Sequence, residues 1–279
     1  MRTLIPLFLL ALLLPACPSG TDDGSLDGGR PDAALGDAGE SDGGDPDGGA
    51  DDGGTPDGGD PDGGADDGGT GPIDPLAGFG GLSGDCWVLD TELTDPTPSI
   101  HVNHLDFALD PYDHPADYDQ LTPGGQVIID TQNAGGSSEY SELFSYEVLA
   151  RCEGAALLKT ETEIVYDTAG AITDILVNID GQKIGVSVTR AMIWPLDDPF
   201  PVSVAQARLE DKLAGVIASS ANVSAGDAWV KQILHFIAYG QEHADSLVTA
   251  FDLVDPALKA DTIVYVTVSD GDDLFIYQQ

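Results

Sequence analysis

The sequence predicts an α/β domain whose central mixed sheet contains an antiparallel three-stranded meander and is flanked by helices. Three short runs rich in β-branched and apolar residues are separated by turn sequences that contain Asp and Gly. They span Thr160–Tyr166, Ile172–Ile179 and Ile184–Thr189, and this pattern is typical of strands joined by hairpins. Apolar residues elsewhere recur at helical spacing, and Thr262–Val268 is a strongly β-branched run that we expect to be a central strand.

The start of the chain carries the features of an export signal. Arg2 is followed by the apolar run Leu4–Leu14, which is too short to span a bilayer as a helix. The sequence Leu14-Pro15-Ala16-Cys17 resembles the lipobox of bacterial lipoproteins. This resemblance implies that residues 1–16 are removed as a signal peptide and that Cys17 receives lipid, palmitate included. We therefore expect an exported protein anchored in the cell membrane or the outer membrane, with an ordinary signal peptide and a free thiol as the alternative.

Residues 17–84 are predicted to form a disordered acidic linker. A string of 15 residues, Asp45–Gly59, begins again at Asp60. Almost no apolar side chains accompany these residues, so no core can offset the entropy of the chain. Glycine adds flexibility, and closely spaced aspartates repel one another and extend the coil. The linker is expected to hold the folded part away from the membrane.

The sequence is strongly acidic, with a formal net charge of −39. Of its 49 acidic residues 16 lie in Thr21–Gly71, and two of its ten basic residues, Arg2 and Arg30, precede Pro72. The remaining 33 acidic and eight basic residues leave a charge of about −25 from Pro72 to the end. Nucleic-acid binding needs a basic surface that releases counterions. Because the eight bases are scattered singly, we expect no nucleic-acid partner, and a protein partner stays unknown.

Three cysteines occur in the chain. If Cys17 takes lipid, Cys86 and Cys152 remain as an even pair. An exported protein lies in an oxidising compartment, where such a pair can form a disulfide. Two buried free thiols are the alternative.

The globular domain is expected at residues 85–279 and begins with a short strand at Cys86–Leu89. The next polar segment, Ile100–Tyr118, contains a cluster of His and Asp side chains of the kind that can bind metals. Its spacing matches no metal motif, and Pro111 and Pro115 indicate an irregular loop. We expect a polar surface segment, with a metal site as the alternative. The cluster consists of His101, His104, Asp106, Asp110, Asp113, His114 and Asp117.

The rest of the domain is predicted as strands and helices around the meander. Gln126–Asp130 is expected to be a strand. The following helix carries Glu139 and Glu142 in its first turns, where the helix dipole favours acids, and it ends at Gly154. Later elements are expected as three helices and a final strand, at Val202–Ser219, Ala225–Tyr239, His243–Val254 and Leu274–Tyr277.

This order of helix, three strands, helices and strand resembles the PD-(D/E)XK nuclease-like fold of restriction endonucleases and Holliday-junction resolvases. In that family a helix before the meander offers a Glu, the second strand begins with an Asp, and the third strand carries (D/E)-x-K. The resemblance places Asp174 at the Asp position and Glu142 or Glu147 at the helix position. It implies that Asp174 and Glu142 hold Mg²⁺ for phosphodiester hydrolysis.

The third strand departs from the family pattern because it reads Ser187-Val188-Thr189. The carboxylate and the Lys are both replaced, which removes charge that would hold a hard cation. Ser187 and Thr189 point to one side of the strand, either into a ligand cleft or as a half-buried polar pair. Some family members place the Lys on a neighbouring helix. Candidates for such a migrated site are Lys231, Gln232 and His235 on one predicted helix and Gln206 on another.

The sequence thus favours an envelope lipoprotein whose folded part is a non-catalytic binding or structural module on a nuclease-like scaffold with a degenerate active site. No cofactor is expected for that function. The alternative is a metal-dependent nuclease or phosphodiesterase with a migrated site, which would use Mg²⁺. Sequence motifs of serine hydrolases, phosphate-binding loops, dinucleotide-binding folds and zinc peptidases are absent.

Overall fold

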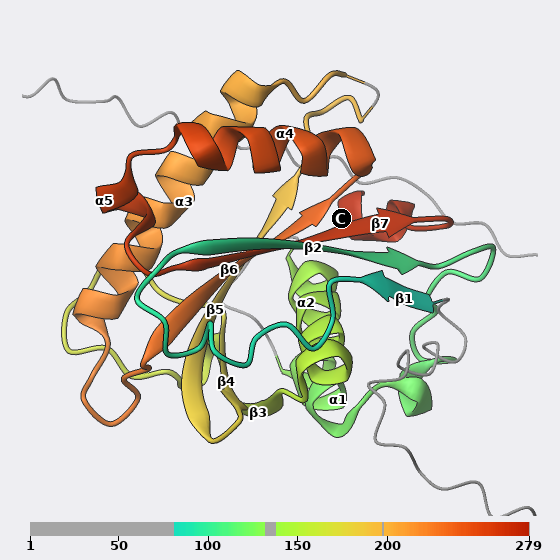
Figure 1. Cartoon of the computed structure of the whole chain (residues 1–279). Helices are drawn as coiled ribbons and strands as arrows, with labels where there is room; N and C mark the ends of the chain where they lie inside the picture. The colour runs from blue at the N-terminus through green and yellow to red at the C-terminus, as the bar shows by residue number, and fades with distance from the viewer. Residues whose placement is uncertain (1–80, 132–137, 197, 279) are drawn as a thin grey trace, which may run out of the picture. The chain divides into compact units, whose positions relative to one another are not determined.

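The computed structural model describes residues 81–131, 138–196 and 198–278, and in them helices cover both faces of one sheet (Figure 1). The described sheet has seven strands in the order β1-β2-β7-β6-β5-β4-β3. Their bounds are β1 Gly81–Gly84, β2 Ser99–Asp106, β3 Ala156–Thr160, β4 Ile175–Ile179, β5 Gln182–Ala191, β6 Lys231–Ala238 and β7 Ile263–Asp270.

The meander occupies one end of this sheet. Strands β3, β4 and β5 pair antiparallel in chain order, whereas β5, β6, β7 and β2 run parallel to one another. Parallel neighbours need crossover connections, and two of these contain α3 (Val202–Asn222) and α4 (Gln241–Leu253). At the other end, β1 pairs antiparallel with β2. The predicted mixed sheet flanked by helices is confirmed, but its strand order is not that of a simple meander.

Two hydrophobic cores form on the two faces of the sheet. Helices α1 (Pro123–Asp130) and α2 (Glu139–Glu153) lie on one face, and α3 and α4 lie on the other (Figure 1). Because side chains alternate along a strand, Ile233 of β6 joins the core beneath α2 and Leu234 joins the core beneath α3 and α4. The remaining described elements are short: η1 Tyr118–Gln120, η2 Glu161–Glu163, α5 Pro256–Lys259 and α6 Leu274–Tyr277.

Several predicted elements are confirmed. Helix α2 begins at Glu139 and ends at Gly154, whose φ of 66° is the left-handed conformation that favours glycine after a helix. Helices α3 and α4 and strand β7 also lie where the sequence predicts them, within a few residues.

The helix predicted at Ala225–Tyr239 is wrong, because the residues from Lys231 to Ala238 form strand β6. All eight residues of β6 are buried. A central strand covered on both faces has apolar residues on both sides, so its pattern cannot be distinguished from that of a buried helix by periodicity alone.

Four shorter predictions are also wrong. Gln126–Asp130, expected to be a strand, belongs to α1, whose start is fixed by the Thr122 hydroxyl accepting from the Gly125 N–H at 3.2 Å and by Pro123 in the first turn. Leu274–Tyr277 is the helical turn α6, and Cys86–Leu89 is not a strand. Ser99–Asp106, within the segment expected to be a loop, is β2, which pairs along its whole length with β7.

The first strand of the meander lies earlier than predicted, at Ala156–Thr160. The chain leaves the sheet at Thr160 because Glu163 Oε2 accepts from the Thr160 N–H at 3.0 Å and from its hydroxyl at 3.2 Å, which closes the turn η2. Beyond it, the Val165 N–H donates to Asp227 Oδ2 at 2.8 Å. These side-chain contacts decide where the strand ends, and they cannot be predicted from the strand propensity of the residues.

The predicted signal peptide, Cys17 and nearly all of the predicted linker lie outside the described residues. Residues 81–84, which the sequence places in that linker, form β1. Of the helices in the described ranges, none has the length and apolar character needed to cross a bilayer.

Candidate functional site

Asp174 lies directly before β4, at the position that the family resemblance indicates. Its backbone N–H donates to the Val186 carbonyl at 3.2 Å, and its Oδ2 accepts from the Val188 N–H at 2.7 Å. Burial raises the pKa of Asp174 to about 7, and the nearby carboxylates of Glu142 and Glu161 add to the increase. The Val188 N–H and Lys212 act in the opposite direction. Asp174 is therefore only partly ionised near neutral pH.

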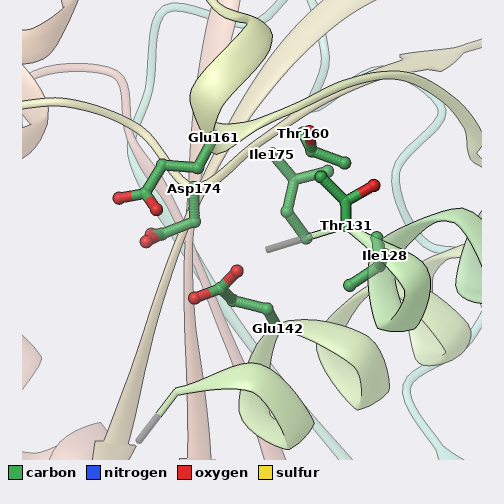
Figure 2. Close-up of a pocket in the computed structure, with 7 residues that line it drawn as sticks. All are labelled: Ile128, Thr131, Glu142, Thr160, Glu161, Asp174 and Ile175. Carbon is green, nitrogen blue, oxygen red and sulfur yellow. The ribbon is translucent and has the colours of Figure 1, made fainter. Parts of the chain in front are cut away.

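Three carboxyl groups from different elements point toward one another at this place. Figure 2 shows Glu142 of α2, Glu161 of η2 and Asp174 before β4 around one small cavity. Glu142 is 5% exposed, and its Oε1 accepts from the Ser138 hydroxyl at 2.6 Å. The cavity has a volume of about 10 Å³, close to the space that one water molecule needs.

The arrangement does not fit the Mg²⁺ that the resemblance implies. Within the described ranges, no group of three or more His, Cys, Asp or Glu side chains is placed to hold a metal ion. One oxygen of Asp174 already accepts from a backbone N–H. The structure brings the predicted pair Asp174 and Glu142 to one cavity.

A second cleft opens on the α3 side of Asp174. Its volume is about 300 Å³, and its lining includes Asp174, Ser187, Asp211 and Lys212. Ser187 therefore lies in a cleft, which is the first of the two alternatives that the sequence left open for it. Thr189 is partly buried opposite Phe236 of β6 and is not in this lining.

The other sequence candidates lie elsewhere. Glu147, the alternative helix acid, is fully buried and accepts from the Thr122 N–H at 2.9 Å, the Thr122 hydroxyl at 2.7 Å and Arg151 Nε at 3.0 Å. Gln206 donates to Glu210 on its own helix. Lys231, Gln232 and His235 belong to strand β6 and to neither cavity at Asp174, so the predicted helix face for a migrated site does not exist.

The His and Asp residues of the segment 100–118 do not converge either. They are distributed along β2 and the loop after it, and the three histidines contact different partners. His101 Nε2 lies 3.1 Å from Ser99 Oγ, His104 Nδ1 lies 3.5 Å from Asp270 Oδ2, and His114 Nδ1 lies 3.1 Å from the Tyr112 hydroxyl. The segment fits the expected polar surface, although part of it is a strand.

Lys212 and Glu161 are site residues that sequence reasoning missed. Lys212 lies in a helix that the sequence predicts, and the burial of Leu209, Leu213 and Val216 against the sheet orients that helix so that Lys212 lines the cleft at Asp174, before the start of β4. The sequence predicts a strand at Glu161, and this residue reaches the cavity only because the chain turns at η2. The helical period of α3 could have placed Lys212 beside the buried face, whereas no signal in the sequence indicates Glu161.

Cys86 and Cys152 are joined by a disulfide in the structure. The bond connects the segment after β1 to the last turn of α2. Asn103 Nδ2 of β2 also contacts Cys152 Sγ, at 3.9 Å. This is the pairing expected if Cys17 is modified and the other two cysteines form a disulfide.

Comparisons with known proteins identify no family, and no family model matches the chain. A 152-residue stretch, 52% of the chain, is 44% identical to the AAC-rich mRNA clone AAC4 protein of Dictyostelium discoideum, of which it spans 22%. Among solved structures, Pyrococcus furiosus SfsA in complex with Ca²⁺ is similar over 48% of this chain and 57% of that one, with 13% identity and a TM-score of 0.25.

Proposed function

We propose that this protein is a lipid-anchored envelope protein whose folded part is a non-catalytic binding or structural module on a nuclease-like scaffold. The scaffold part of the proposal is supported by element order. Helix α2 precedes the antiparallel strands β3, β4 and β5, and α3 then leads to the parallel strand β6. Asp174 before β4 and Glu142 on α2 occupy the positions that the resemblance assigns to the metal ligands.

The observation that carries the non-catalytic part is the chemistry around Asp174. On β5, Ser187 and Thr189 replace the acid and the Lys, and the pKa of Asp174 is raised to about 7. Catalysis of phosphodiester hydrolysis by a metal needs several carboxylates that hold the ion in fixed geometry. The replacement on β5 removes one of them together with the Lys, and the net negative charge of the chain opposes the approach of nucleic acid.

A cleavage assay tests this proposal directly. The full chain is incubated with fluorogenic DNA and RNA in the presence of Mg²⁺ or Mn²⁺, alongside Asp174→Ala and, as a matched control, Asp252→Ala on the exposed surface of α4. We expect no cleavage above that of buffer for any of the three. Cleavage by the wild type and by the Asp252 variant that disappears in Asp174→Ala would overturn the non-catalytic assignment.

Metal-dependent phosphodiester hydrolysis is the second candidate, and one observation favours it. Lys212 of α3 lines the same cleft as Asp174 and Ser187 and lowers the pKa of Asp174, as a migrated lysine would. Under this alternative, Lys212→Met abolishes cleavage as completely as Asp174→Ala does. Retained cleavage in Lys212→Met would remove Lys212 from the alternative.

The lipid anchor is proposed from the sequence Leu14-Pro15-Ala16-Cys17 alone. Two or more acyl chains on Cys17 would hold the protein at the membrane surface. Bacterial cells expressing the full chain or Cys17→Ala are fed a clickable palmitate analogue, and the protein is isolated and examined for label. We expect label on the wild type alone, whereas an unlabelled wild type would exclude the anchor.

A further inference from the structure

The short helix α6 follows β7, and both of its ends contact a single buried hydroxyl. Ser269, near the end of β7, is 1% exposed. Its Oγ lies 2.6 Å from Oδ2 of Asp273, directly before α6, and 2.5 Å from the hydroxyl of Tyr277, the last residue of α6. It also lies 3.3 Å from the Ala238 carbonyl at the end of β6. The proposed function uses none of these four residues, which we call the Ser269 cluster.

The number of protons in the Ser269 cluster decides whether all of its hydrogen bonds can form. A serine hydroxyl donates one hydrogen bond and accepts two. The Ala238 carbonyl only accepts, and an ionised Asp273 also only accepts, so the two compete for the proton of Ser269. A protonated Asp273 instead donates to Ser269, which then donates to Ala238, while the Tyr277 hydroxyl donates to the second lone pair of Ser269. Only protonated Asp273 therefore allows all three contacts of Ser269 to be hydrogen bonds at once.

Burial adds to this preference for the protonated form. Asp273 is 5% exposed, and the loss of solvent raises its pKa to about 6. The carboxylates of Asp270 and Asp272 add to the increase, whereas the Ser269 hydroxyl and the N–H of Asp273 itself act in the opposite direction. Asp273 therefore loses its proton between mildly acidic and neutral pH.

Other elements also bring titratable groups to α6 and to its immediate neighbours. These groups are His104 of β2, Tyr140 of α2, Arg190 of β5, Tyr239 after β6 and His243 of α4. His104 Nδ1 lies 3.5 Å from Asp270 Oδ2, and Arg190 Nη1 donates to the Ile276 carbonyl at 2.8 Å. Because arginine stays charged at any ordinary pH, its bond holds the end of α6 independently of pH, whereas the bond at Asp273 depends on a proton.

Helix α6 covers aromatic side chains of the core beneath α2. The ring centroid of Phe275 lies 5.2 Å from that of Phe107, 5.5 Å from that of Tyr140 and 5.6 Å from that of Phe144. Phe107 and Phe144 are fully buried. Opening of α6 would expose this apolar surface, so α6 is closed in most molecules at any pH.

We propose that the Ser269 cluster makes the closure of α6 depend on pH. A proton on Asp273 completes the hydrogen bonds that hold α6 against β7 and β6. Loss of that proton leaves a buried carboxylate near Asp270 and Asp272, and opening of α6 returns this carboxylate to water. The helix therefore opens more often at neutral pH than at mildly acidic pH. This device goes beyond the proposed function, since it depends neither on the lipid anchor nor on Asp174.

Hydrogen exchange of two α6 amides in the full chain measures the opening. The Ile276 N–H donates to the Asp273 carbonyl at 3.0 Å, and the Gln278 N–H donates to the Leu274 carbonyl at 3.1 Å, so both amides are protected while α6 is closed. Exchange rates are recorded by NMR at pH 5 and at pH 7.5. Division by the intrinsic rate at each pH gives protection factors that can be compared.

Protection should fall about tenfold from pH 5 to pH 7.5. The pKa of Asp273 is about 6 when α6 is closed and returns to its ordinary value of 3.8 when α6 is open. The closed state therefore binds more protons than the open state, and closure weakens as pH rises through this window. Equal protection of Ile276 in the wild type at both pH values would overturn the proposal.

Two variants assign the pH dependence to Asp273. Asp273→Asn keeps the shape of the side chain and offers an N–H donor to Ser269 at every pH, as the protonated acid does. We expect its α6 amides to be equally protected at pH 5 and pH 7.5. Asp252→Asn removes an exposed charge from α4 and should keep the tenfold change. A tenfold change that persists in Asp273→Asn would contradict the role of the Ser269 cluster.

The amide of Phe236 separates opening of α6 from unfolding of the whole domain. Strand β6 is paired on both sides, so its amides exchange only when the sheet opens. We expect Ile276 to be less protected than Phe236 at both pH values. Equal protection factors would show that α6 opens only together with the sheet, and the proposal would be rejected. These wild-type measurements decide the outcome even if Asp273→Asn does not fold.

Discussion

Helix α2 presents two polar side chains one turn apart, Glu142 and Ser145, and they join buried clusters of opposite character. Ser145 belongs to a chain of hydrogen bonds in which each donor meets an acceptor. Glu142 belongs to the cavity where it meets Asp174 and Glu161, all of them acids. The same helix face therefore holds a cluster that stabilises the fold and another that costs stability.

The first cluster, which we call the Ser145 chain, runs through four residues. Ser145 Oγ lies 2.7 Å from His235 Nδ1, and His235 Nε2 lies 2.7 Å from Thr267 Oγ1. The Thr267 hydroxyl donates to Asn103 Oδ1 at 2.6 Å. Since that hydroxyl donates onward, Nε2 of His235 carries the proton and Nδ1 accepts from Ser145. Burial lowers the pKa of His235 to about 3, so the imidazole stays neutral.

A serine next to a histidine suggests a nucleophile and its base, but the Ser145 chain lacks what that chemistry requires. All four residues are fully buried, and none of them lines either of the cavities at Asp174. A catalytic pair must meet its substrate. In the Ser145 chain every polar group has a hydrogen-bond partner, which indicates a structural role. At the acid cluster like charges lie beside a cleft, so binding of a ligand or ion there would change the stability of the folded state.

The largest effect is expected from breaking the Ser145 chain. Thr267→Val keeps the shape of the side chain but leaves His235 Nε2–H and Asn103 Oδ1 without partners. Each orphaned buried group costs roughly 1–3 kcal/mol, so the free energy of unfolding should fall by about 2–4 kcal/mol. Urea unfolding of wild type and variant measures it. Thr249→Val on the exposed side of α4, where the hydroxyl donates to its own helix, is the control and should change little.

Removing a charge from the acid cluster should stabilise the protein, whereas breaking the Ser145 chain should destabilise it. The pKa of Asp174 is raised to about 7 in the folded state, above its ordinary value of 3.8. Between these values the folded state binds more protons than the unfolded state, so this group lowers stability as pH rises through that window. Asp174→Asn should therefore stabilise the protein by roughly 1–3 kcal/mol at pH 8, with little effect near pH 4.

Urea unfolding at both pH values measures that difference. Other buried acids also titrate in the window, so the quantity to compare is the difference between wild type and Asp174→Asn, which cancels their contribution. Asp180→Asn, at an exposed turn of the meander, is the control. A destabilising effect of Asp174→Asn at pH 8 would mean that the carboxylate is compensated after all, and the contrast between the clusters would fail.

The sequence predicts two members of the acid cluster and none of the contacts in the Ser145 chain, for a physical reason. Asp174 and Glu142 were found because a family pattern assigns acids to the start of a strand and to the helix before it. The sequence predicts a helix at His235, because β6 is buried on both faces and its apolar pattern has no strand period. Its partners Ser145, Thr267 and Asn103 come from three other elements, and only the order of strands in the sheet brings them together.

The same distinction applies to the fold. The meander, α2 with its terminal Gly154, and β7 follow from local patterns that each segment carries by itself. The end of β3 at Thr160 and the start of α1 at Pro123 depend on single side-chain contacts, from Glu163 and Thr122. Such contacts decide boundaries by a few kilocalories per mole or less, which is why strand propensity at Gln126–Asp130 and beyond Thr160 indicated the wrong element.

The smallest effect concerns Lys212, the cation that faces the acid cluster from the opposite side. It lowers the pKa of Asp174 from an exposed position on α3, where solvent screens its charge. Lys212→Met should therefore raise the pKa of Asp174 further above its ordinary value. Carbon NMR of the labelled carboxyl, titrated in wild type and variant, measures the shift, and Lys183→Met, which removes another lysine whose Nζ makes one exposed bond to the Gly226 carbonyl, is the control. An unchanged pKa would remove Lys212 from the electrostatics of Asp174 and, with it, the observation that favours the catalytic alternative.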